Sequence, residues 1–277
     1  GKLMVPRIVS SSIYQLNNFV DSIFGSLATI VGEGGVAVLY FSYRLVLFPI
    51  GIFSNALTQA ILPTLSTQAL EEDHAKLKQT LSWGLRASFF LLLPASVGFM
   101  VLALPIISAL FGGGKFDLVS VGLTANALFF YSIGLFAYGS TKIVQSCFFA
   151  LKDTLTPTKI AALTLAMNIV LNSLLMFPLK IGGIALANSI SGIITFFILF
   201  SILKKRLGGF KGEEIFISFL RILAASLWMG VACITLNKAF NFIFALIGGI
   251  LSYIIFCFIF RVPEMRQLWR WLAKRYA

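Results

Sequence analysis

Arg44 is the charged side chain in this sequence that most clearly needs a partner. It lies in the apolar segment 36–62, which contains no other charged residue. At about 1.5 Å of rise per residue, a helix would hold the guanidinium roughly 15 Å deep, near the middle of a hydrocarbon core about 30 Å thick. A cation at that depth is costly unless it has a partner or a water-filled cavity. Because a guanidinium is a planar fork of donors, an anionic ligand such as a phosphate suits it.

Asp21 is expected at about the same depth as Arg44. The two residues flank a predicted turn that contains Glu33, with Asp21 twelve residues before it and Arg44 eleven after it. Two interpretations stay open. In one, the charges form a structural ion pair, because lone charges in a membrane usually find a partner. In the other, they line an aqueous cavity, where Arg44 binds a phosphate and Asp21 has a separate role.

Three asparagines form a second polar group, in another predicted hairpin. Asn168 and Asn172 lie four residues apart on one helical face, and Asn188 follows Lys180 in the turn by eight residues, level with Asn172. Together with Asp21, they would supply one carboxylate and three amide oxygens, which are hard ligands suited to a small cation such as Na⁺. The alternative is hydrogen bonding between helices, worth about 0.6 kcal/mol per bond. The spacing alone favours this alternative.

Prolines and a lysine inside the apolar segments give weaker signals. Pro49 and Pro94 predict helix kinks, which suit transporter hinges but also occur in passive membrane helices. Lys142 lies near one end of its segment, so we expect it to snorkel toward the surface. The sequence shows no nucleophile and base pair, no cluster of metal ligands and no phosphate loop in a strand–helix context. An enzyme is therefore the least favoured class, and no cofactor is expected apart from Na⁺ as a coupling ion.

The elements that carry these groups follow from the composition. Of 277 residues, 58% are hydrophobic and 12% are charged, whereas soluble domains average about 25% charged. Long apolar runs separated by short polar clusters predict helices rather than the alternating strands of a β-barrel. The first run carries a polar stripe on one helical face that includes Asn17 and Asp21. We predict an all-α, polytopic membrane protein with about eight transmembrane helices, at residues 7–31, 36–62, 82–111, 118–150, 158–177, 182–203, 215–237 and 240–260.

The net charge of +12 is explained by topology rather than by nucleic-acid binding. Seventeen of the 22 Lys and Arg residues lie before the first span or after the even-numbered spans, and the alternate loops hold only Lys115, Lys180 and Lys238. By the positive-inside rule, both termini are predicted to be cytoplasmic. The same rule favours an even number of spans.

Two cytoplasmic stretches divide the predicted chain. Residues 66–81 have leucines at helical spacing and predict an interfacial helix between the second and third spans. The stretch 204–214 is rich in Lys, Arg and Gly and predicts a boundary. We expect a six-helix lobe at residues 1–205, followed at 206–277 by a two-helix hairpin and a basic tail.

Four short segments carry a family resemblance. They are YRLVLFPIG at residues 43–51, AILPTLS at 60–66, GKF at 114–116 and KDTLTP at 152–157. In this order they resemble the C-terminal part of the MurJ (MviN) family of bacterial lipid II flippases, within the superfamily that includes the MATE exporters. The resemblance implies a fold of two six-helix lobes and two extra helices, of which this chain resembles the second lobe and the extra pair.

The resemblance also implies roles for the polar residues. Arg44 matches an essential arginine of the family's central cavity, which engages the diphosphate of lipid II. A sodium site of the second lobe corresponds to Asp21, Asn168, Asn172 and Asn188, with Ile184 supplying a carbonyl oxygen. Two departures weaken this transfer, because Leu47 and Asn172 stand where relatives carry acidic residues.

The expected function is therefore that of the C-terminal half of a lipid II flippase. It would move the undecaprenyl-diphosphate-linked precursor across the bacterial inner membrane by alternating access, among membrane lipids, in cell-wall biosynthesis. The family's first six-helix lobe is missing from this sequence, so we expect a fragment or a chain that assembles with a separate lobe. The alternatives are an exporter of another lipid-linked oligosaccharide or polysaccharide, a MATE-like exporter, or a membrane scaffold without transport activity.

Overall fold

The computed structural model describes residues 4–71, 73–114, 116–209 and 212–266. The basic tail predicted after the last helix lies largely at 267–277, outside the described residues. Within the described ranges every regular element is a helix, and the only β-pairing is an isolated bridge between Gly113 and Phe116. The prediction of an all-α protein is confirmed.

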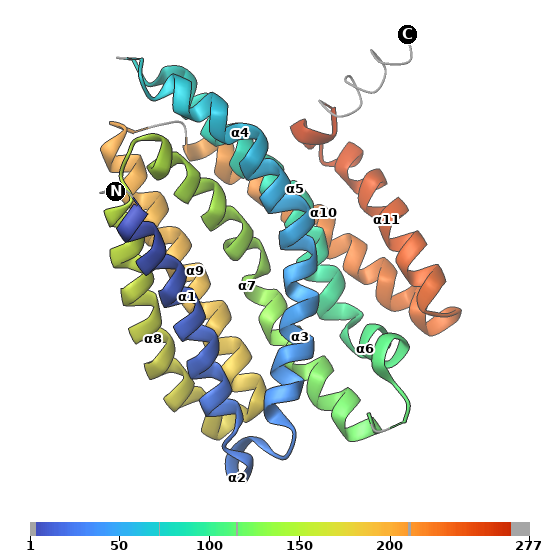
Figure 1. The fold of residues 1–277 in the computed structure, drawn as a ribbon. Coiled ribbons are helices and arrows are strands. Elements are labelled where there is room, and N and C mark those ends of the chain that lie inside the picture. Colours follow the sequence, from blue (N-terminus) through green and yellow to red (C-terminus); the bar gives the residue numbers. More distant parts are fainter. Residues whose placement is uncertain (1–3, 72, 115, 210–211, 267–277) are drawn as a thin grey trace.

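The described residues form twelve helical elements, most of which are labelled in Figure 1. Seven of the helical stretches are long and apolar enough to cross a membrane, with α3, η1 and α4 counted as one. Helix α1 is the remaining long one, with 22 residues, and its polar stripe lowers its hydropathy. The elements are α1 (Met4–Gly25), α2 (Ala28–Val31), α3 (Gly35–Pro49), the π-helix η1 (Ile50–Ser54), α4 (Asn55–Gln68), α5 (Ala75–Val101), α6 (Ala103–Phe111), α7 (Leu118–Ala150), α8 (Leu155–Leu179), α9 (Ile181–Arg206), α10 (Gly212–Ala239) and α11 (Phe242–Ile259).

Helix α7 is the centre of the bundle. It packs against α9, α5, α3, α4 and α6, while α1 lies along α8 at one side. Glycines allow the closest approaches: a Cβ at Gly139 of α7 would lie 2.0 Å from Leu92 Cδ1 and 2.3 Å from Ser54 Oγ. The fully buried leucines and isoleucines at these contacts form the apolar core.

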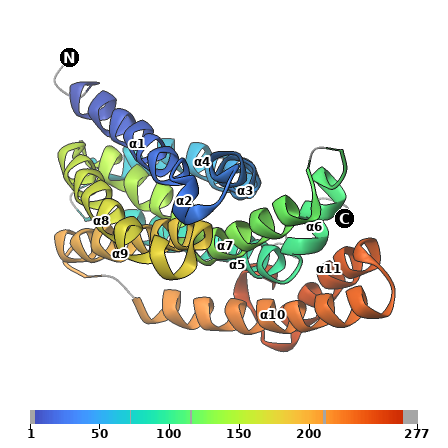
Figure 2. The ribbon, with the colours of Figure 1, turned by 90° about the horizontal axis from the view of Figure 1, so that it is seen from below.

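Helices α10 and α11 form a hairpin that packs on α5, on the side of the bundle away from α1 (Figure 2). The hydroxyl of Tyr253 in α11 donates a 2.7 Å hydrogen bond to the carbonyl of Phe90 in α5. A buried ion pair adds to this contact: Arg86 Nε of α5 lies 3.4 Å from Glu264 Oε1, and Ser218 Oγ of α10 donates to Glu264 Oε2 at 2.9 Å. The division at residues 205 and 206 stays a prediction.

The predicted interfacial helix at 66–81 is wrong. Helix α4 continues to Gln68, and α5 begins at Ala75, where the backbone N–H donates to Asp73 Oδ1 at 3.1 Å. Leu70, which the spacing placed on a helical face, is 76% exposed in the intervening turn. The remaining leucines of the pattern, Leu77 and Leu81, belong to the buried face of α5.

Two prolines shape the spans, one as predicted and one not. The π-helix η1 begins directly after Pro49, so the helical hydrogen bonding changes there. The predicted span 82–111 is broken at Leu102, between α5 and α6. Pro105 explains the break, because it lacks an N–H for the carbonyl four residues earlier, at Val101, and its ring crowds that carbonyl. Hinge roles for Pro49 and Pro94 stay predictions.

The connections alternate between the two ends of the bundle. Figure 1 shows the turns after α1, α6, α8 and α10 at one end, and those after α4, α7 and α9 at the other. The loops rich in Lys and Arg thus share one end. The assignment of that end to the cytoplasm stays a prediction.

Candidate functional site

The carboxylate of Asp21 lies at the centre of a cluster of amides. Asn172 Nδ2 donates to Asp21 Oδ1 at 2.9 Å, and Asn188 Nδ2 donates to Asp21 Oδ2 at 3.0 Å. Asn17 Nδ2 approaches Oδ2 at 3.5 Å and donates more closely, at 3.1 Å, to Asn188 Oδ1. Asp21 is only 7% exposed. Its hydrogen bonds therefore come from neutral amides on three helices, α1, α8 and α9.

The remaining residues of the predicted ion site belong to the same cluster. Asn168 Oδ1 accepts a 2.8 Å hydrogen bond from Asn172 Nδ2, and the carbonyl of Ile184 accepts one of 3.1 Å from Asn188 Nδ2. The predicted hydrogen bonding between helices is thus present, and it converges on a carboxylate. Two amide oxygens, Asn17 Oδ1 and Asn172 Oδ1, are buried without a hydrogen-bond partner.

The α8–α9 hairpin explains why residues so distant in sequence meet. Lys180, at φ 52°, turns the chain between the two helices. Helix α9 then packs tightly against α8, since a Cβ at Gly183 would lie 2.0 Å from the carbonyl oxygen of Leu175. This packing sets Asn172 and Asn188 side by side, and α1 brings Asp21 to them.

Arg44 faces a pocket of about 380 Å³ between α1, α3 and α7. The guanidinium is exposed, and its Cζ lies 5.0 Å from the ring centroid of Tyr40. Asp21 lines the same pocket but forms no ion pair with Arg44 in the described structure. The structural ion pair considered from the sequence is therefore wrong, and the guanidinium is free to bind an anion.

A neighbouring pocket of about 340 Å³ is lined by a second cationic side chain, Lys142. Its Nζ donates a 2.7 Å hydrogen bond to Asn55 Oδ1, next to the π-helix. The two pockets share Gln15, Asn18, Tyr43 and Leu47, so Arg44 and Lys142 line one continuous wall, hereafter the cationic wall. Lys142 faces a pocket instead of snorkelling as predicted. Leu47 keeps this wall free of the acidic side chain that the family resemblance placed there.

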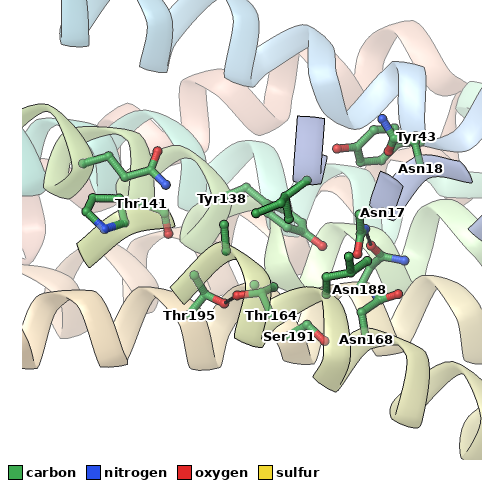
Figure 3. Close-up of a pocket in the computed structure, with 16 residues that line it drawn as sticks. Asn17, Asn18, Tyr43, Tyr138, Thr141, Thr164, Asn168, Asn188, Ser191 and Thr195 are labelled. Carbon is green, nitrogen blue, oxygen red and sulfur yellow. Dashed lines mark hydrogen bonds between the residues drawn. The ribbon is translucent and has the colours of Figure 1, made fainter. Parts of the chain in front are cut away.

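A third, smaller pocket lies between α1, α7, α8 and α9, with a cavity volume of about 50 Å³ (Figure 3). Its labelled side chains extend from Thr141 at one end to Asn168 and Asn188 at the other. The hydroxyls of Thr164 and Thr195 lie 2.5 Å apart between α8 and α9. We call this the polar pocket, and it reaches the Asp21 cluster through Asn17, Asn168 and Asn188.

Sequence reasoning missed Asn17 and Lys142 as parts of these sites. Asn17 precedes Asp21 by four residues on the polar stripe of α1, and that spacing was a usable signal. Lys142 had no such signal, because its side chain direction depends on how α7 packs against α3 and η1. No group of three or more His, Cys, Asp and Glu side chains that would hold a transition metal occurs among the described residues.

Comparison with known proteins places these features in a family. The sequence profile described as "Lipid II flippase MurJ" matches residues 1–254. A probable lipid II flippase MurJ of Haemophilus influenzae is 33% identical over 237 residues, covering 83% of this chain and 46% of the relative. That of Thermotoga maritima is 31% identical over 273 residues, covering 97% and 54%. This chain thus spans about half the length of these relatives.

Solved structures agree with the sequence comparison. A lipid II flippase MurJ in an inward closed conformation superposes with a TM-score of 0.77 at 28% identity, covering 94% of this chain and 53% of that one. An outward-facing MATE family multidrug transporter superposes with a TM-score of 0.55 at 18% identity, which shows a shared fold alone. With its apolar helices and the profile match over nearly its whole length, the chain belongs to the MurJ family of lipid II flippases and is a multi-pass protein of the inner membrane.

Proposed function

We propose that this chain forms the second lobe of a lipid II flippase, which carries the undecaprenyl-diphosphate-linked precursor across the inner membrane by alternating access. The observation that carries the proposal is the guanidinium of Arg44, which has no ion-pair partner and faces a cavity from the tenth residue of the apolar helix α3 in a MurJ family member. A diphosphate offers oxygens in the geometry that a guanidinium fork accepts. Tyr40 supports this orientation through its ring face.

The Asp21 cluster is proposed to bind the coupling ion, Na⁺. Its groups fit a small hard cation: one carboxylate, the Ile184 carbonyl and four side-chain amides, two of which have a buried oxygen without a hydrogen-bond partner. Each side-chain amide has an oxygen that can coordinate a cation and N–H groups that can donate to a carboxylate. In this structure the N–H groups of Asn172 and Asn188 donate to Asp21. An uncompensated carboxylate among neutral groups in a membrane is costly, and a bound cation offsets that cost.

The remaining parts take their proposed roles from this arrangement. The basic ends of the helices would face the cytoplasm, together with both termini. The α10–α11 hairpin, where Trp228 and Phe256 stack with ring centroids 5.3 Å apart, would offer an apolar surface to the polyprenyl tail. A first lobe, in the same polypeptide or a separate one, would close the other side of the cavity.

A chimera tests the proposal. The C-terminal half of the Haemophilus influenzae relative is replaced by this chain, and the chimera is expressed in cells depleted of their own flippase. We expect the chimera to support growth and its Arg44→Ala variant to permit lysis. Loss of charged hydrogen bonds of about 1.5–3 kcal/mol each lowers affinity by tenfold or more.

The control is Lys238→Ala, which removes an exposed cation at the end of α10. Equal membrane levels are verified by immunoblotting. Growth of the Arg44→Ala chimera at the unmodified rate would contradict the role of Arg44. A membrane-inserted chimera that never supports growth would contradict the flippase assignment and favour a scaffold.

A further inference from the structure

We infer that the polar pocket is a hydrated antechamber through which a small monovalent cation reaches Asp21 from the end of the bundle where α8 begins. This inference rests on the proposed binding of a cation by the Asp21 cluster. It adds a route that is separate from the cationic wall, and it assigns residues that neither the ion site nor the substrate site uses.

Several polar atoms that line the polar pocket are buried without a hydrogen-bond partner. They include Thr141 Oγ1, Ser191 Oγ, Asn168 Nδ2 and Asn17 Oδ1. The first three belong to side chains that are 3%, 2% and 1% exposed. An unsatisfied buried polar group costs about 1–3 kcal/mol. Because these unpartnered atoms line a cavity, water molecules inside it would supply the missing hydrogen bonds.

The polar pocket runs along α8 and α9, parallel to the direction in which an ion would have to move to reach Asp21. Asn188, Ser191 and Thr195 occupy successive turns of α9, a distance of about 10 Å at 1.5 Å per residue. On α8, the lining runs from Asn168 to Pro157, the third residue of that helix. The pocket therefore leads from the depth of Asp21 to the end of the bundle that carries the basic loops.

The chemistry of the residues lining the polar pocket favours a cation over an anion. None of the described residues that line the polar pocket is charged, and most of its polar atoms are hydroxyl or amide oxygens. At its deep end, Asn188 and Asn17 lie against the Asp21 carboxylate. Hydroxyl and amide oxygens replace the water around a monovalent cation, while the carboxylate attracts it.

The polar pocket and the cationic wall thus separate ligands by charge. They meet along Asn18, Tyr43, Tyr138 and Gln145, which line both. On one side of these residues, Arg44 and Lys142 suit an anion; on the other, the neutral oxygens of the polar pocket suit a cation. Asp21 lines the Arg44 pocket and is joined to the polar pocket through its contacts with Asn17 and Asn188. A cation that used the polar pocket would reach Asp21 without passing the two cationic side chains.

Cysteine accessibility tests this route. The native thiols Cys147, Cys233 and Cys257 are buried, and they are replaced in the chimera along with the cysteines of the fused half. Ser191→Cys and Thr195→Cys then place single thiols in the pocket. Leu163→Cys and Ile194→Cys are the matched controls, because these neighbours on α8 and α9 lie outside the lining and are exposed on the bundle surface.

The probe is Ag⁺, a small monovalent cation that reacts with thiolates. It is added to inside-out vesicles, and its reaction is read as lost labelling by a maleimide after denaturation. We expect the pocket thiols to react at least about tenfold faster than the control thiols, because a thiol in lipid stays protonated and unreactive. We expect Na⁺ to slow the reaction at Ser191→Cys, one turn from Asn188, and Asp21→Asn to abolish that protection.

Each outcome bears on the inference. Equal rates at pocket and control positions would overturn the antechamber. Fast reaction without protection by Na⁺ would overturn a route to Asp21. Neither result depends on growth, so the pocket can fail while the Arg44 test succeeds. The reverse outcome, a reactive and protected pocket in a chimera that does not support growth, would keep the route and reject the flippase assignment.

Discussion

Asp21 and Arg44 line one pocket, yet the structure gives each of these two residues a different partner. The carboxylate accepts hydrogen bonds from Asn172 and Asn188, while the guanidinium lies against the ring of Tyr40. Two opposite charges at a similar depth in a membrane would ordinarily form an ion pair. Their separation leaves two charged sites of opposite sign in one lobe.

The first prediction concerns Asp21. Na⁺ should raise the unfolding temperature of the purified chimera, because a ligand of the folded state stabilises it by about 2.7 kcal/mol at a hundred times its dissociation constant. Asp21→Asn keeps the size of the side chain and removes its charge, so the Na⁺ effect should disappear. Glu33→Gln, in the turn before α3, is the control. An unchanged Na⁺ effect in Asp21→Asn would place the ion elsewhere.

The second prediction concerns Lys142. As part of the cationic wall, it should add to the binding of an anionic lipid headgroup, so Lys142→Met should weaken lipid II binding by roughly five- to thirtyfold, or about 1–2 kcal/mol. Lys142→Arg should retain most of the affinity. Binding to the purified chimera is measured by native mass spectrometry, with Lys180→Met as the control in the exposed turn. Equal affinities in Lys142→Met and the unmodified chimera would remove Lys142 from the site.

The third prediction concerns the ion pair that ties the hairpin to the lobe. Glu264 is 7% exposed and Arg86 is 17% exposed at the side chain, so breaking the pair leaves a buried charge alone. Arg86→Met or Glu264→Gln should therefore lower the free energy of unfolding by about 3–5 kcal/mol. The double variant Arg86→Met, Glu264→Leu should lose less than the sum of the single changes.

Thermal unfolding of the chimera in detergent, together with proteolysis in the connection between α9 and α10, measures this effect. Faster cleavage in the single variants would show that the hairpin detaches from α5. Additive losses in the double variant would mean that the two side chains act independently.

The fourth prediction concerns pH and Asp153, in the connection between α7 and α8. Partial burial raises the pKa of Asp153, but hydrogen bonds from the Thr156 N–H and hydroxyl, together with Arg206, outweigh it and hold the pKa below the usual 3.8. A depressed folded-state pKa stabilises the protein above the unfolded-state value, and this contribution is lost as pH falls through the folded-state pKa.

Asp153→Asn should therefore destabilise the chimera at neutral pH, and the difference from the unmodified protein should shrink as the pH falls below 3.8. Unfolding temperatures across this pH range measure it. Asp117→Asn, at the start of α7, is a second helix-cap carboxylate for comparison. A stability difference that stays constant down to the lowest pH would contradict the role given to the Asp153 charge.

Most of the helices could be predicted, because their apolar runs match the thickness of a membrane. The errors lie where local chemistry outweighs hydropathy. Asp73 accepts a hydrogen bond from the Ala75 N–H in the turn before α5, within the predicted helix at 66–81. Pro105 divides an apolar run that hydropathy alone predicts to be one helix. Asp73 and Pro105 are both visible in the sequence, but only the backbone around them shows which helix ends or begins there.

The candidate sites divide in the same way. The sequence by itself determined which residues were out of place in lipid: a guanidinium, a carboxylate and three amides within apolar runs, at depths that the helical rise sets. Only the tertiary structure decided their partners. Side-chain direction depends on how α1 packs on α8 and how α7 packs on η1. In that packing Asp21 accepts hydrogen bonds from the asparagines, Arg44 has no ion-pair partner, and Lys142 and the polar pocket lie between the helices. Hydropathy does not predict these contacts, because they depend on how each helix is rotated about its own axis.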